Sequence, residues 1–189
     1  YPFGRSGFEV SKLEEATAKR YLPATELSKL KSTTASNPQC EYARKLFLFS
    51  YYCYGISFID MAMLTTVQIK QMEDGDYIVY KRQKIKRQKG VKPISIKITP
   101  AIRQLIGSLQ AASPTVDDFL LPIVTRSGYT GERLYMHIRT RYSKYQKYLR
   151  LLAEELGIDF HLTSYVSRHT AAMTLQRNNI PREVISQML

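Results

Sequence analysis

The spacing of apolar residues predicts a chain made mainly of helices. Residues 39–54 leave little polar surface, with Ala43, Phe47 and Cys53 among their apolar positions, so we expect this helix to be central. Ser57 and Thr163 have side chains of the kind that caps the start of a helix. The periodic stretches together predict helices over residues 23–32, 39–54, 57–64, 99–110, 132–156, 163–177 and from 181 onward.

Alternation of apolar and polar residues predicts strands in the middle of the chain. Residues 65–70 are rich in β-branched side chains, residues 75–86 alternate after the turn EDGD, and residues 92–99 carry isoleucine at every second position. We therefore expect three antiparallel strands, the last two joined by a hairpin at residues 87–90. The apolar run at residues 119–124 predicts a buried extended segment. The fold class is α+β, a mainly helical domain with a small three-stranded antiparallel sheet.

Composition adds a statement about partners. The 189 residues include 28 Lys and Arg against 16 Asp and Glu, a formal net charge of +12. Such a charge predicts a polyanionic partner, nucleic acid first and an anionic membrane surface second. No apolar run approaches the about 20 residues that a membrane-spanning helix needs. Two cysteines give no disulfide framework and favour a reducing, intracellular setting, while three histidines show no metal-ligand spacing, so we expect no metal and no cofactor.

Cations crowd into the predicted hairpin, with no acid among them. If the strand ran through this segment, Tyr80, Arg82, Lys84 and Lys86 would share one face. Lysines can simply protect a sheet edge, but the absence of acids favours contacts with phosphates. The set comprises Lys81, Arg82, Lys84, Lys86, Arg87, Lys89 and Lys92.

The long predicted helix interleaves cations with tyrosines. Its basic residues include Arg139, Arg141 and Lys144, and tyrosines stand at positions 142, 145 and 148. This pattern suits a helix that contacts DNA. It equally suits an amphipathic helix whose tyrosines pack inward while the cations stay in water.

The order of several short motifs resembles the catalytic domain of the tyrosine recombinases, the phage integrase family. The motifs are SYYCYGISFIDMAML, YKRQK, FLLPI, LTSYVSRHTAA and IPREVISQML, and they extend from about residue 24 to the end. They are most similar to the branch of conjugative-transposon and other mobile-element integrases. The resemblance implies site-specific recombination of double-stranded DNA through a 3′-phosphotyrosine intermediate, without metal or nucleotide cofactor. It also implies self-assembly into a synaptic tetramer and a prokaryotic, cytoplasmic location at the nucleoid.

The resemblance assigns roles to three residues. Arg168 takes the position of the second catalytic arginine, which would stabilise the charge on the phosphate oxygens. Lys84 takes the position of the hairpin lysine, which would protonate the leaving 5′ oxygen. Asp60 takes the position of the acid that supports the site. DNA-backbone contacts are expected from Lys81, Lys86, Arg87, Lys89, Arg139, Arg141 and Lys144.

Two positions depart from the family pattern. Ser57 stands where the first catalytic arginine is expected, and Arg82 is the candidate to supply the missing charge. Tyr165 stands at the histidine position, where a phenol can still donate a hydrogen bond to phosphate. His169 is a poorer substitute, because it is turned about 100° around the helix from Arg168.

The resemblance also predicts the domain organisation. Residues 1–23 are expected to be a linker that follows an N-terminal core-binding domain, and residues 24–189 to be the catalytic domain, ending before its nucleophilic tyrosine. The chain alone would then be unable to cleave DNA. Two other readings stay open: a recombinase-derived DNA-binding module that has lost catalysis, and a basic helical domain that binds protein or RNA.

Overall fold

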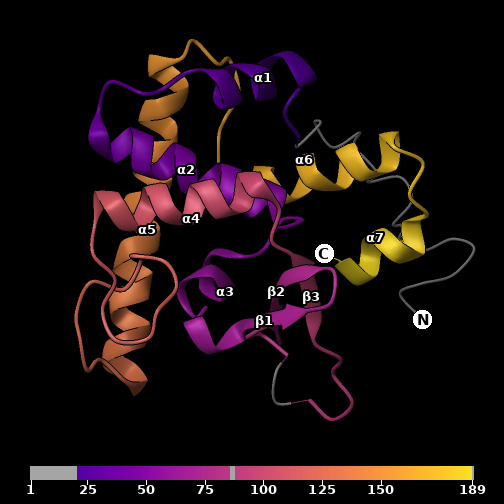
Figure 1. Ribbon diagram of the computed structural model, residues 1–189. Helices are drawn as coiled ribbons and strands as arrows, with labels where there is room; N and C mark the ends of the chain where they lie inside the picture. Colours follow the sequence, from indigo (N-terminus) through magenta and orange to yellow (C-terminus); the bar gives the residue numbers. More distant parts are fainter. Residues whose placement is uncertain (1–20, 86–87, 189) are drawn as a thin grey trace, which may run out of the picture.

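The computed structural model describes residues 21–85 and 88–188. Each predicted helix is present within one or two residues of its expected bounds (Figure 1). The periodic apolar positions were therefore a sufficient signal for the helices. The α-helices are α1 (Ala24–Ser32), α2 (Pro38–Tyr52), α3 (Phe58–Ala62), α4 (Pro100–Ala112), α5 (Gly131–Glu155), α6 (Ser164–Arg177) and α7 (Arg182–Met188).

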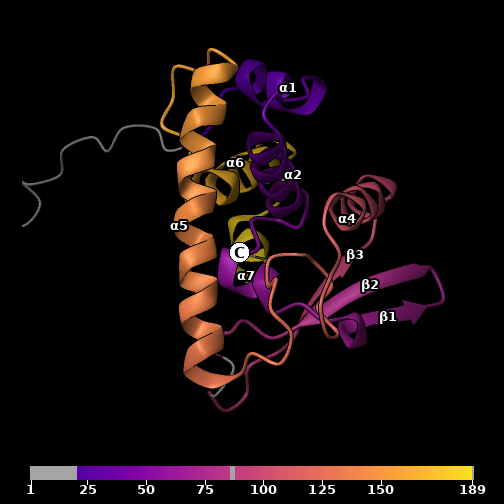
Figure 2. The ribbon, with the colours of Figure 1, turned by 90° about the vertical axis from the view of Figure 1, so that its left-hand side faces the viewer.

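The helix α2 is the centre of the molecule, as its sequence predicted. The Asn37 side chain caps it by accepting the backbone N–H groups of Gln39 and Cys40, and Pro38 stands in its first turn. It packs against α4, α5 and α6, and Figure 2 shows it between α5 and α4. Phe47 and Phe49 are fully buried there. This packing fixes the relative positions of the helices that carry the candidate site.

The sheet has the predicted number, order and direction of strands. Its strands are β1 (Ile69–Met72), β2 (Gly75–Tyr80) and β3 (Ile94–Lys97), antiparallel in the order β1-β2-β3. Ile78 and Ile96 are paired neighbours, and both are buried in the hydrophobic core. The first strand begins later than predicted. The residues before it form a short 3-10 helix, Thr66–Gln68, because Thr65 and Gln68 cap one another.

The prediction that the second strand continues through the basic segment is wrong. Strand β2 ends at Tyr80, which pairs with Ile94. The next pair would place Lys81 opposite Pro93, which has no N–H to donate to the ladder. The backbone N–H of Gln83 is instead bonded to the Asp60 carboxylate. The expected strand face therefore does not form.

The residues expected on that strand face differ in their exposure to solvent. The Tyr80 side chain is buried, Arg82 is half-buried, and Lys84 is exposed in a turn. Lys86 and Arg87 lie outside the described residues. No helix among those described is long and apolar enough to cross a membrane.

Candidate active site

Arg168 lies near the start of α6, against the loop that follows α2. Its Nε donates a hydrogen bond of 2.7 Å to the Gly55 carbonyl oxygen. Gly55 has φ +79°, and a Cβ at this position would lie 2.6 Å from the Arg168 Cα. Only a residue without a side chain permits this approach. Gly55 therefore sets both the distance of α6 from the loop and the direction of the guanidinium.

A buried contact between two hydroxyl groups joins the same elements. The Ser50 Oγ on α2 lies 2.8 Å from the Ser167 Oγ on α6 and 2.8 Å from the Ile56 carbonyl oxygen. Ser167 is also bonded to the Ser164 carbonyl oxygen. Both serines are almost fully buried. Their hydrogen bonds hold the loop 53–56 and the first turn of α6 in one arrangement.

Asp60 connects α3 to the basic segment. Its side chain is buried. Its Oδ2 accepts a hydrogen bond of 2.6 Å from the Ser57 hydroxyl, and its Oδ1 accepts one of 2.7 Å from the backbone N–H of Gln83. The Ser57 Oγ in turn caps α3 by accepting the Asp60 N–H. Ser57 therefore acts as a helix cap and as a partner of the acid, and Asp60 fixes the chain between Arg82 and Lys84.

Two guanidinium groups share the electrostatic environment of the site. Burial lowers the pKa of Arg168, and the nearby positive charge of Arg82 lowers it further, while Tyr80, Tyr165 and Asp60 act in the opposite direction. Among the described residues, neither arginine has a carboxylate within ion-pair distance. An anion placed between them would relieve this repulsion.

Arg168 and Tyr165 stand at the junction of two pockets. The first, of about 450 Å³, is lined by α5 and α6 and by the loop around Gly55. The second, of about 510 Å³, lies between α6 and α7. Arg168 and Tyr165 share one face of α6, because both line both pockets. His169 lines only the second of these two pockets. The Tyr165 ring packs edge-on against the His169 ring, at 4.6 Å between centroids.

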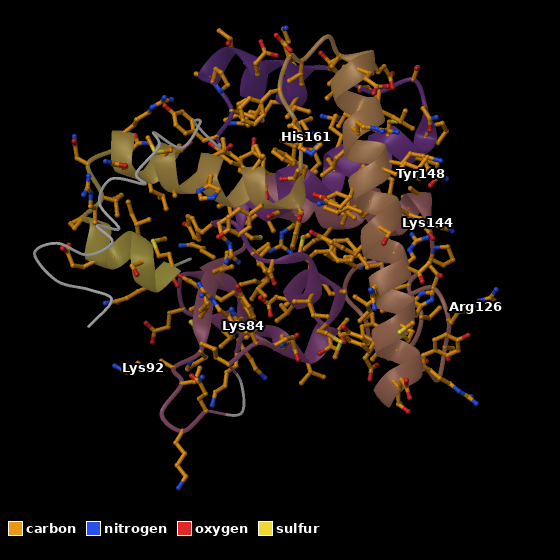
Figure 3. The ribbon with its side chains drawn as sticks, turned by 180° about the vertical axis from the view of Figure 1, so that it is seen from behind. Lys84, Lys92, Arg126, Lys144, Tyr148 and His161 are labelled. Atoms are coloured by element: carbon orange, nitrogen blue, oxygen red, sulfur yellow. The ribbon has the colours of Figure 1, made fainter. Side chains whose placement is uncertain are left out.

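The cations of α5 fall into two groups. Arg139 lines the pocket that contains Arg168, together with Tyr135 and Tyr142. Arg141 and Lys144 line a different pocket of about 280 Å³ between α2 and α5. Figure 3 shows Lys144 and Tyr148 on the side of α5 away from Lys84. The interpretation that the tyrosines pack inward holds for Tyr145, which is buried, whereas Tyr142 lines the candidate site. A DNA contact of this helix stays a prediction.

The remaining predicted DNA contacts lie in the basic segment. Lys81 and Lys89 are exposed, and Lys86 and Arg87 fall outside the described residues. Thr163 stands at the N-cap of α6, but its side chain makes no cap hydrogen bond. The first N–H of this helix, that of Ser164, is bonded instead to the Gln146 side chain on α5.

Sequence reasoning missed the residues that hold Arg168. Gly55 was visible only as a break after the central helix, and nothing marked Ser50 or Ser167 as a pair across 117 positions. Tyr135 was not assigned to the site, although it lies four residues before Arg139 and seven before Tyr142, on one helix face. That spacing was the one available signal.

Comparison with known proteins gives the family. The crystal structure of XerA recombinase superposes with a TM-score of 0.59 and 21% identity, and the match covers 89% of this chain and 55% of that one. The chain thus spans about half the length of that structure, and the likeness shows the fold of the recombinase catalytic domain. No curated protein sequence matches the chain. A sequence model described as the phage integrase family matches residues 20–189, so the chain belongs to this family of tyrosine site-specific recombinases.

Proposed function

We propose that residues 24–189 form the catalytic domain of a site-specific recombinase that cleaves and rejoins double-stranded DNA through a 3′-phosphotyrosine intermediate. The observation that carries the proposal is the setting of Arg168. Its Nε is bonded to the Gly55 carbonyl oxygen, and its two terminal nitrogens make no hydrogen bond among the described residues. The guanidinium is thus held at one edge and open at the other, as a clamp for two phosphate oxygens requires.

The chemistry follows from where charge develops. Attack of a tyrosine oxygen on the phosphorus builds negative charge on the non-bridging oxygens, which Arg168 and the neighbouring Arg82 would stabilise. Lys84, exposed on the segment that Asp60 tethers, would donate a proton to the departing 5′ oxygen. Tyr165 would donate its hydroxyl to a phosphate oxygen. No step of this scheme requires a metal.

The attacking tyrosine, in this proposal, lies outside residues 1–189. Two described tyrosines influence the pKa of Arg168, namely Tyr80 and Tyr165. Tyr80 is buried, and burial strongly raises the pKa of its hydroxyl, which makes it a poor nucleophile. Tyr165 occupies the position of the phosphate-binding histidine. Tyr135 and Tyr142 also line the pocket that contains Arg168, and the family pattern gives neither of them the role of nucleophile. We therefore expect residues 1–189 alone to form no covalent adduct with DNA.

The finer assignments of the sequence are also part of the proposal. The motifs that resemble conjugative-transposon integrases support a protein that moves a mobile element. Cleavage and exchange of two DNA partners would need a synaptic tetramer on the recombination site. A prokaryotic protein of this kind would act in the cytoplasm, at the nucleoid.

A second candidate function is that of a DNA-binding module that has lost catalysis. The observation that favours it is Ser57, whose hydroxyl is already used by Asp60 and by the N-terminus of α3. Ser57 therefore supplies no charge at the position of the first arginine, and catalysis would require Arg82 to supply it. Both candidates predict binding to duplex DNA. They differ in whether the full-length protein cleaves it.

DNA binding is tested by its dependence on salt. Residues 1–189 should bind duplex DNA with an affinity that falls steeply as salt rises, because each neutralised phosphate contributes about 0.9 to the slope of log K against log salt. Replacing Lys81 and Lys89 by Gln should reduce this slope by one to two. The matched control replaces Lys29 and Lys31 of α1 by Gln and should leave it unchanged. A shallow slope, or equal effects of the two pairs, would favour a protein or RNA partner.

A further inference from the structure

The pocket between α5, α6 and the loop around Gly55 contains aromatic side chains in addition to Arg168. We propose that it receives one unstacked nucleobase of the DNA, adjacent to the phosphate that Arg168 holds. This inference rests on the proposed function and names a binding subsite within it. The residues that carry it are three tyrosines, Tyr135, Tyr142 and Tyr165, and two arginines, Arg139 and Arg168.

Two of the aromatic residues that line the pocket, Phe58 and Tyr142, belong to one cluster of packed rings. The Phe58 ring lies 5.1 Å from the buried Tyr145 ring, and the two are nearly parallel, 21° apart. The Tyr142 ring also packs against Phe58, at 5.3 Å between centroids. The Tyr142 hydroxyl lies 3.1 Å from the Ser164 Oγ and accepts a hydrogen bond from Gln146. These contacts hold the Phe58 and Tyr142 rings in place, so little ordering of these two side chains would be needed when a flat ring binds.

Two further aromatic rings that line the pocket are exposed to solvent. Tyr135 on α5 is 59% exposed and Tyr165 on α6 is 56% exposed, and both line this pocket. Large exposed aromatic residues around one concavity mark a binding surface. Stacking on aromatic rings is the interaction by which proteins hold single bases, and it tolerates any base because every base has a π-face.

The charge of the pocket selects a nucleotide over an apolar protein segment. Arg139 and Arg168 line it, no acid does, and neither arginine is ion-paired among the described residues. A pocket lined by aromatic rings and by two guanidinium groups complements a base flanked by phosphates. Burying an apolar peptide there would instead desolvate two charges without compensation. A base enters more readily from a bulge than from a paired stack.

The test compares two DNA duplexes of the same sequence, one fully paired and one with a single unpaired adenine in one strand. Their dissociation constants for residues 1–189 are measured at one salt concentration. The bulged duplex should bind about tenfold more tightly. Tyr135→Leu should reduce this preference, and Tyr135→Leu with Tyr142→Leu should abolish it. Tyr135→Phe, which keeps the ring, should retain it.

The control is Tyr148→Leu, which removes a ring from the same helix but from another pocket and should leave the preference unchanged. Equal affinities of the two duplexes for the wild-type chain, with a steep salt dependence, would overturn this inference and leave the proposed function standing. Persistence of the preference in a folded double variant would also overturn it. Absence of binding to either duplex would overturn both.

Discussion

At the scale of single residues, the site depends on how one arginine is held. A half-buried guanidinium that donates one edge to a backbone carbonyl keeps its other edge in a fixed direction, so little rotamer entropy would be lost on binding an anion such as the proposed phosphate. In Arg168 that carbonyl belongs to Gly55. Arginine itself was identifiable from the motif LTSYVSRHTAA. The residue that positions it, Gly55, was not identifiable, because in sequence a glycine beside a helix end is an ordinary helix terminator.

Gly55→Ala should therefore be unusually destabilising. The new methyl group would meet the Arg168 Cα at 2.6 Å in addition to the strain of φ +79°, so we expect a loss of roughly 3 kcal/mol in the free energy of unfolding. Gly128→Ala is the matched control, because Gly128 has φ +72° and open space around it, and should cost about 1 kcal/mol. Urea unfolding measures both. Equal losses would show that the contact with α6 is unimportant.

At the scale of elements, a buried carboxylate holds the chain segment that follows strand β2. Asp60 on α3 binds the backbone of Gln83, three residues after the end of β2. The segment between Arg82 and Lys84 is therefore positioned by a helix rather than by a partner strand. This arrangement brings charges of the sheet region near Arg168 without a hairpin face.

Asp60→Ala should free this segment. The Gln83 N–H would lose its acceptor, so its amide hydrogen should exchange at least tenfold faster, and the fold should lose roughly 2 kcal/mol. Asp60→Asn keeps one oxygen that can accept the Gln83 N–H and should preserve most of the protection. Hydrogen exchange followed by NMR separates the two variants. A Gln83 amide that stays protected in Asp60→Ala would contradict the tether.

The helices could be predicted from sequence and the basic segment could not, for a physical reason. Helical periodicity is a local property, and α2, α4 and α5 each show it over three or more turns. The alternation of residues 75–86 is equally local, but strand pairing depends on the facing chain. Pro93 lies opposite the residue that follows β2, and the Asp60 carboxylate accepts the backbone N–H of Gln83. Both facts require the tertiary arrangement.

At the scale of the whole molecule, charge and pockets coincide at one place. The net charge of +12 is spread over the chain, but Arg82, Arg139 and Arg168 are brought to one site from three separate elements. Composition alone predicted the polyanion and the motif order predicted the family. The junction of two pockets at Arg168, and the division of the α5 cations between two faces, came only from the fold.

The most direct test of the account is covalent trapping by the full-length natural protein. A nicked suicide substrate that carries its recombination site should yield a protein–DNA adduct with the wild-type protein. Arg168→Ala should yield none, although its folding and its binding to the same DNA remain, because the phosphate loses the clamp that stabilises the transition state. An adduct formed by Arg168→Ala at the wild-type rate would contradict the assignment of Arg168 as the phosphate clamp.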